Sequence, residues 1–119
     1  MMSLYNNDLK LNTSVKTDET NAIYCPRCGG LNLHQRSVTS TFRDDEDEDG
    51  TEVRHKRLDV EIKRRKDKDI VGRRDVLHID FQCEECSYYN DENEPQDMLT
   101  LAITQHKGST YIEWLPWEN

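Results

Sequence analysis

Two matched cysteine motifs constrain this chain more than any other feature. Its four cysteines form two C-x-x-C pairs, Cys25 with Cys28 and Cys83 with Cys86. Two intervening residues let both sulfurs of a pair reach one metal ion, and two pairs complete the tetrahedral sulfur shell that zinc favours in structural sites. Since protein then occupies all four positions, none stays open for water or substrate. The sequence predicts one structural Zn²⁺ bound by these four cysteines.

The first motif carries more local detail than the second. Pro26 stiffens the turn between its cysteines, and Gly29 can adopt the positive φ that lets backbone N–H groups point at the thiolates. This C-P-x-C-G arrangement is similar to a zinc knuckle. Ser87 follows the second motif in place of glycine, so we expect a less regular turn there.

Three alternatives compete with zinc. A disulfide framework needs an oxidising compartment, and the start MMSLYNNDLKLN has neither the charged region nor the apolar run of a signal peptide, so we expect a cytoplasmic protein. A thioredoxin-type pair would lie in a βαβ pattern, which this sequence lacks, and would need no second pair. An iron centre with the same four ligands stays open.

The two motifs are far apart in the sequence. Cys28 and Cys83 enclose 54 residues, against about 15–20 in the usual double motif. Because loop closure costs grow with the logarithm of length, tripling the loop costs roughly 1 kcal/mol more. Structural zinc binding contributes about 10–16 kcal/mol. The zinc site can therefore tolerate the long insertion between the motifs, residues 31–82, especially if it folds as a hairpin.

Composition indicates a small domain with a thin core. Hydrophobic residues make up 34% of the 119 residues. The typical value of about 45–50% counts glycine and not tyrosine, but the chain has five of each, so its figure on that basis is also 34%. Small domains with thin cores often depend on metals. We expect a flexible polar tail over residues 1–21 and a single domain over residues 22–119.

Apolar residues alternate along several segments, as is typical of β-strands. In the first segment we expect one face to carry His34, Arg36, Val38, Ser40 and Phe42. The acidic run 44–49 should form the tip of the first hairpin, and residues 63–75 a basic connection. The architecture expected is mostly β, an expanded zinc ribbon with antiparallel hairpins. Its strands are predicted at residues 31–43, 51–62, 76–82, 98–107 and 110–114, with a second acidic loop over residues 90–97.

Several stretches together resemble a protein group. They are CPRCGG with Leu33-His34-Gln35, Arg73-Arg74-Asp75, the strand into Cys83-Glu84-Glu85-Cys86, and Gln105-His106-Lys107-Gly108-Ser109-Thr110 with Glu113-Trp114. Residues 22–115 resemble small zinc-ribbon-like proteins of bacterial mobile elements and phages. The resemblance implies an architecture and a setting, and no catalytic role.

Charge is unevenly distributed. The formal net charge is −8, which repels nucleic acid at long range, yet ten of the sixteen basic residues lie between positions 54 and 74, beside only four acids. This basic segment could contact phosphates, or the acidic run 44–49 could fold beside it and neutralise it; both alternatives stay open. The candidate contacts are Arg54, Lys56, Arg57, Lys63, Arg64, Arg65, Lys66, Arg73 and Arg74.

The remaining chemistry-bearing residues form no catalytic set. The four histidines lack the mutual spacing of ligands, and no serine–histidine–acid set or phosphate-cradling glycine loop is present. Arg73-Arg74-Asp75 could grip an anion or pair internally to fix the loop. Trp114 and Trp117 either close the core or form a docking patch, with Trp117 the better docking candidate. We expect no enzyme, no small-molecule substrate and no membrane partner.

The function expected from these features is that of a non-enzymatic, zinc-stabilised adaptor or regulator. Its partner would be a protein of the nucleic-acid machinery. The alternative is a module that binds DNA or RNA directly through the basic segment. A weaker alternative is an acidic mimic of nucleic acid that inhibits a nucleic-acid-binding protein.

Overall fold

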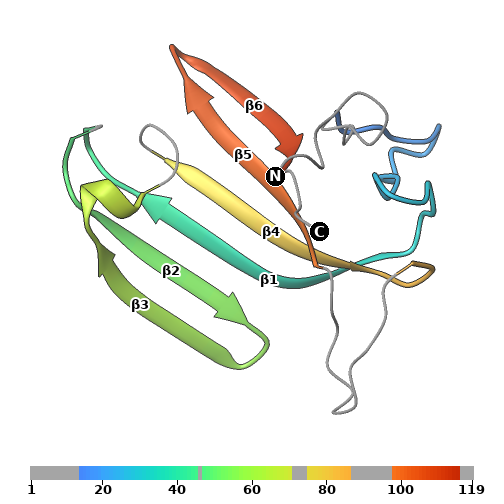
Figure 1. Cartoon of the computed structure of the whole chain (residues 1–119), viewed down its shortest axis with the longest axis horizontal. Helices are drawn as coiled ribbons and strands as arrows, with labels where there is room; N and C mark the ends of the chain where they lie inside the picture. The colour runs from blue at the N-terminus through green and yellow to red at the C-terminus, as the bar shows by residue number, and fades with distance from the viewer. Residues whose placement is uncertain (1–13, 46, 71–74, 87–97, 116–119) are drawn as a thin grey trace.

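The protein folds around one antiparallel sheet of six strands. The structure is a computed structural model that describes residues 14–45, 47–70, 75–86 and 98–115. The strands lie in the order β3-β2-β1-β4-β5-β6 (Figure 1). Their bounds are β1 Leu33–Phe42, β2 Gly50–Lys56, β3 Asp59–Arg65, β4 Val76–Cys83, β5 Leu99–His106 and β6 Ser109–Trp114, with a short 3-10 helix η1 at Asp67–Asp69. The prediction of a mostly β fold is confirmed. The described residues include no helix that is long and apolar enough to span a membrane.

Two of the expected hairpins are present. Strands β1 and β2 pair antiparallel around the acidic run, and β5 and β6 pair around a two-residue turn at Lys107 and Gly108. Both turn residues have positive φ, 52° and 83°, as a type I′ turn requires. The second acidic loop, residues 90–97, lies outside the described residues.

The prediction of one strand over residues 51–62 is wrong. The chain reverses at Arg57 and Leu58, and Lys56 pairs with Asp59 across a two-residue turn. Arg57 takes a φ of 53°, which an arginine side chain adopts at some cost. Residues 63–65 therefore belong to β3, and the basic connection begins later than expected.

The prediction that five alternating residues of β1 share one face is also wrong. The register between β1 and β4 shifts between Gln35 and Ser37, which marks a β-bulge. His34 pairs with Gln82, whereas Val38 pairs with Ile79 on the opposite face. An extra residue reverses the alternation of a strand. His34 thus lies on the polar side of the sheet.

The sheet has one apolar face along its whole width. Two rows of paired residues cross all six strands on this face. The first row contains Val60, His55, Val38, Ile79, Leu101 and Trp114; the second contains Ile62, Val53, Ser40, Leu77, Ile103 and Ile112.

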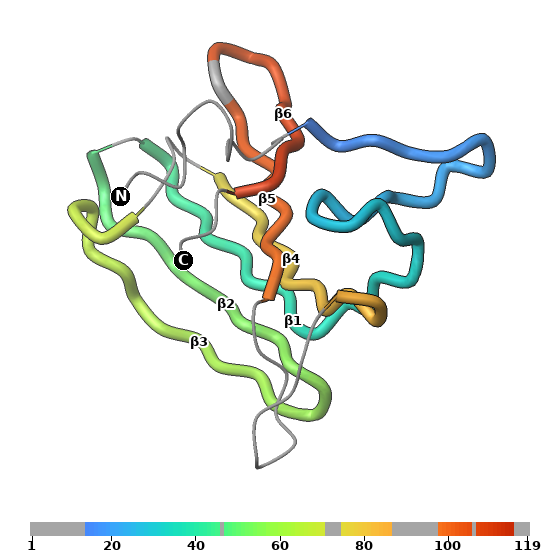
Figure 2. The backbone as a smooth tube through the Cα atoms, turned by 45° about the vertical axis from the view of Figure 1, so that its right-hand side comes forward, coloured from blue at the N-terminus to red at the C-terminus, as the bar shows by residue number. Residues whose placement is uncertain are grey.

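The largest buried cluster occupies one end of this face, and Val76 and Ala102 are buried on the opposite face. Phe81, Leu99, Leu101 and Trp114 are buried together with Cys25 and Cys83, and Val15 and Ile23 of the N-terminal segment pack against them. Figure 2 shows this segment, residues 14–30, beside the ends of β1 and β4, on the side of the molecule away from β3. Residues 14–21, which the sequence places in a tail, thus contribute to the core.

Candidate metal centre

The four cysteines converge from two distant segments. Cys25 and Cys28 flank a turn that follows the bridge between Thr17 and Ile23, whereas Cys83 ends β4 and Cys86 lies in the turn after it. Their four Sγ atoms lie within 4.8 Å of one another. The structure therefore brings all four predicted ligands to one point.

The sulfur separations fit a single metal ion. Sγ of Cys25 lies 3.7 Å from Sγ of Cys86, and Sγ of Cys28 lies 3.6 Å from Sγ of Cys83. A tetrahedron with metal–sulfur bonds of about 2.3 Å has edges of about 3.8 Å, whereas a disulfide bond measures about 2.05 Å. All four cysteines are free. The close contacts join one cysteine of each motif, so the ligand set is a single cluster that could bind one ion.

Backbone donors in the first turn face the sulfurs. The N–H of Arg27 donates to Sγ of Cys25 and the N–H of Gly30 donates to Sγ of Cys28, both at 3.4 Å. Gly29 has a φ of 77°, which turns the chain so that the N–H of Gly30 reaches the sulfur. The expected positive φ at this glycine is confirmed.

The second turn is tied to the first by side chains that the sequence analysis missed. The amide of Asn32 donates to Oε1 of Glu85 at 2.6 Å, and the N–H of Glu84 donates to the carbonyl of Asn32 at 3.0 Å. Oε2 of Glu85 also lies 3.4 Å from Sγ of Cys83. A Cβ on Gly30 would lie 2.7 Å from this Oε2, so the carboxylate packs directly over the glycine.

The electrostatics of the two motifs differ. Burial raises the pKa of Cys25, but the N–H groups of Cys28 and Arg27 outweigh it, so the pKa of Cys25 is lowered overall. Burial raises the pKa of Cys86 to about 11, and it also raises the pKa of Cys83. A bound cation would stabilise all four thiolates and release their protons.

The site is continuous with the hydrophobic core. Cys25 and Cys83 are 2% and 0% exposed and belong to the same buried cluster as Phe81 and Trp114. An ion bound here would crosslink the N-terminal segment to the end of β4. Its position favours a structural role.

Comparison with known proteins gives no match: no family model, curated protein or solved structure matches this chain.

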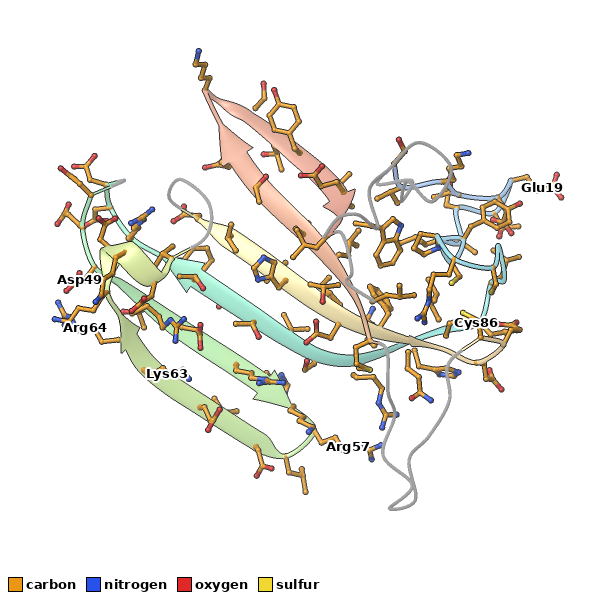
Figure 3. The ribbon with its side chains drawn as sticks, viewed as in Figure 1. Glu19, Asp49, Arg57, Lys63, Arg64 and Cys86 are labelled. Atoms are coloured by element: carbon orange, nitrogen blue, oxygen red, sulfur yellow. The ribbon has the colours of Figure 1, made fainter. Side chains whose placement is uncertain are left out.

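The basic segment lies away from the metal centre, and three of its described cations form ion pairs with acids. Figure 3 shows Lys63 and Arg64 at the end of the molecule opposite Cys86. Glu52 lies 3.7 Å from Nζ of Lys63 and 3.5 Å from Nε of Arg65.

The cations of β2 also face acids. Arg54 is opposite Glu61 and Lys56 is opposite Asp59 in the register of the β2–β3 hairpin. Each strand of this hairpin therefore supplies acids to the cations of the other. Arg73 and Arg74 lie outside the described residues.

Among the described residues, Asp49 of the acidic run contacts the basic segment. Oδ2 of Asp49 lies 3.8 Å from Nζ of Lys66, and Oδ1 of Asp49 accepts a hydrogen bond from the N–H of Asp67 at 3.0 Å. Asp67 in turn pairs with Arg43, whose side chain is 4% exposed. Asp49 of the acidic run thus contacts Lys66, and Glu52 pairs with Lys63 and Arg65 across the hairpin.

Of the two tryptophan candidates, Trp114 closes the core. It is 1% exposed, and its ring packs edge-on against Phe81 at a centroid distance of 5.6 Å. A side chain this buried offers no docking surface. Trp117 lies outside the described residues.

Proposed function

We propose that this chain is a non-enzymatic adaptor or regulatory protein that binds a protein partner and is held in shape by one structural zinc ion. Four cysteine sulfurs with tetrahedral spacing support zinc, whose usual structural sites have this ligand set. A shell completed by protein leaves no position for substrate. The two cysteine turns on a β scaffold support the finer assignment of an expanded zinc ribbon.

Exposed apolar side chains at one end of the sheet carry the proposal of a protein partner. Phe42, Val60 and Ile62 are 55%, 58% and 71% exposed, and Leu58 at the β2–β3 turn is fully exposed. Phe42, Val60 and Ile62 lie on the apolar face, beyond the end that the N-terminal segment covers. We call Leu58, Val60 and Ile62, which follow one another along the β2–β3 hairpin, the apolar patch. Exposed apolar patches with a polar rim commonly mark protein interaction sites.

The charge pattern favours a protein over a nucleic acid as partner. Nucleic-acid binding draws on cations that are free to neutralise phosphates. Lys63, Arg65 and Lys66 each have an acid within 4 Å, and Arg54 and Lys56 face acids across the hairpin. A setting in the nucleic-acid machinery of a mobile element or phage stays a prediction from the resemblance.

Site-specific photocrosslinking tests the proposal. A photoreactive residue at position 58 should capture a discrete partner in the cells that make the protein, and the substitution Val60→Ser should abolish that capture. A photoreactive residue at position 111 is the matched control, since Tyr111 is 50% exposed and lies away from the patch. Capture of the same proteins from both positions would contradict the proposal.

A salt titration separates this proposal from direct nucleic-acid binding. We expect the metal-loaded protein to bind neither duplex DNA, single-stranded DNA nor RNA at low salt. Binding that weakens linearly with the logarithm of salt concentration, and is lost on charge reversal of Lys63, Arg64, Arg65 and Lys66, would instead identify a nucleic-acid module.

A further inference from the structure

Strand β3 forms one edge of the sheet and has an exposed outer side. It contains seven residues, Asp59–Arg65, and its first six are exposed. An edge strand of this length presents unpaired backbone donors and acceptors to any strand that fits them. We propose that the edge pairs with β3 of a second copy of this chain, so that two sheets join into one. This inference does not rest on the adaptor function.

The charges of β3 are arranged in mirror order. An antiparallel pair of identical strands with Ile62 opposite itself places Asp59 opposite Arg65 and Glu61 opposite Lys63 of the second copy. Each of these pairs occurs twice by symmetry. Opposite charges on directly facing residues stabilise a strand pair, and like charges destabilise it.

The mirror order also selects one register. A two-fold axis perpendicular to the sheet keeps the apolar faces of both copies on the same side. The axis must then lie at a residue of β3, and each choice of that residue defines one register. An axis at Glu61 would set this glutamate against itself, and an axis at Lys63 would set that lysine against itself. The axis at Ile62 places no like charges opposite each other within β3.

The pattern extends into the neighbouring strands. Arg54 faces Glu61, and Glu52 faces Lys63, within each copy. In the joined sheet one row would therefore read Arg54 and Glu61 of one copy, then Lys63 and Glu52 of the second copy. The sign of the charge alternates across four strands, which is the arrangement that a continuous sheet favours.

The backbone geometry of the hairpin supports the register with Ile62 opposite itself. In a two-residue hairpin the two residues that flank the turn exchange both backbone hydrogen bonds, so the N–H and C=O of Asp59 point toward β2. Because the direction alternates along a strand, those of Glu61 and Lys63 also point toward β2. The N–H and C=O groups of Val60, Ile62 and Arg64 then point outward. In the proposed register Ile62 pairs with Ile62, and Val60 pairs with Arg64 of the second copy. Each such pair can exchange two backbone hydrogen bonds.

The other edge of the sheet lacks this self-complementarity. Strand β6 carries a single charged residue, Glu113, and no cation that could face it in a second copy. The inference is therefore specific to β3.

Charge reversal tests the proposal with the full-length, metal-loaded chain. Sedimentation equilibrium should show a dimer for the wild type. Glu61→Lys and Lys63→Glu should each weaken it roughly tenfold to a hundredfold, because each places like charges opposite each other at two symmetric positions. An equimolar mixture of the two variants should form a heterodimer.

The double variant distinguishes a dimer contact from a contact within one copy. Glu61→Lys combined with Lys63→Glu should restore the dimer, because the facing pair regains opposite signs. The same double variant has the worst charges within a copy, where position 61 then faces Arg54 and position 63 faces Glu52. A purely intramolecular role therefore predicts that the double variant is the least stable of the set and that it does not restore association. Circular dichroism of each variant checks that the sheet is retained.

A backbone test removes the dependence on charge. Ile62→Pro deletes an outward-pointing N–H, which an edge strand tolerates, and should abolish the dimer. Ile112→Pro makes the equivalent change on the edge of β6 and should leave the dimer intact. A wild-type protein that stays monomeric up to about 1 mM, or a dimer that Ile112→Pro disrupts and Ile62→Pro does not, would overturn the proposal.

Discussion

The carboxylate of Glu85 accepts a hydrogen bond from the side-chain amide of Asn32 at 2.6 Å, and this contact joins the turns that carry the two cysteine motifs. The other oxygen of the same carboxylate lies 3.4 Å from Sγ of Cys83. The hydrogen bond from Asn32 is the main reason that the pKa of Glu85 is lowered, and it favours the charged form of this carboxyl. An anion therefore lies beside a sulfur that must itself become an anion to bind metal.

Neutralising Glu85 should strengthen metal binding. In Glu85→Gln the amide oxygen can still accept from Asn32, and the new NH₂ group can donate to the Cys83 thiolate. We expect metal affinity to rise by up to about tenfold, measured by competition with a chelating dye. Glu84→Gln is the matched control, since Glu84 lies 2.9 Å from Nε2 of His34 and has no sulfur contact among the described residues. Weaker binding in Glu85→Gln would show that the carboxylate supports the site.

Removing the metal should unfold the domain. Cys25 and Cys83 lie in the same buried cluster as Trp114, so releasing the ion leaves four thiols at a thin core. In a Trp117→Phe background, where Trp114 is the sole tryptophan, chelation should shift the fluorescence to that of exposed tryptophan, and added Zn²⁺ should reverse it. A chelated protein that kept its melting temperature would contradict a structural role for the metal.

Local patterns in the sequence predict the features that depend on neighbouring residues. The spacing of the cysteines predicts their cluster, and the strict alternation over residues 76–82 predicts β4. Gly108 indicates the β5–β6 turn because glycine adopts positive φ without strain.

The turn between β2 and β3 and the bulge in β1 were not predicted, because the residue types at these positions are not typical of turns or bulges. Arg57 and Leu58 are not typical turn residues, although the apolar positions change from odd at Val53 to even at Val60, as a two-residue turn requires. The same change of parity between Leu33 and Val38 marks the bulge in β1. The sequence therefore marks both features through this change of parity and not through the residue types at the turn or bulge.

Two contacts depend on which strand residues lie opposite each other: the hydrogen bond from Asn32 to Glu85 and the ion pair between Glu52 and Lys63. Register is set by contacts between distant segments, so no local pattern predicts it. The exposure of the apolar patch likewise depends on which end of the sheet the N-terminal segment covers.

Truncating Trp114 should be strongly destabilising. The ring belongs to the buried cluster that also contains Cys25 and Leu99, and it makes edge-on contact with Phe81. Trp114→Ala should lower the free energy of unfolding by about 3–5 kcal/mol, measured by urea denaturation of the metal-loaded protein. Trp114→Phe should cost less, because it retains an aromatic ring and removes an Nε1 donor that is buried without a partner among the described residues. Ile112→Ala, at a half-exposed position of the same strand, should change stability by less than about 1 kcal/mol.

Acidification should destabilise the fold partly through His78. This side chain is half-buried in β4, between Thr39 of β1 and Ala102 of β5. Desolvation lowers the pKa of His78 below its ordinary value of 6.5, and the nearby charges of Asp80 and Glu52 offset this only in part. The unfolded chain therefore binds this proton more readily than the folded chain, and the contribution of neutral His78 to stability is lost as the pH falls from 6.5 through the lowered pKa.

Replacing the imidazole should reduce this pH dependence. We expect His78→Gln to lose less unfolding free energy than the wild type between about pH 7.5 and about pH 5.5, which bracket the ordinary histidine pKa. Urea denaturation of both metal-loaded proteins at the two pH values measures the difference, and protonation of the cysteine ligands, common to both proteins, cancels in it. His55→Gln is the matched control, since His55 is exposed in β2. Equal losses in wild type and His78→Gln would show that burial of His78 imposes no cost on its protonation.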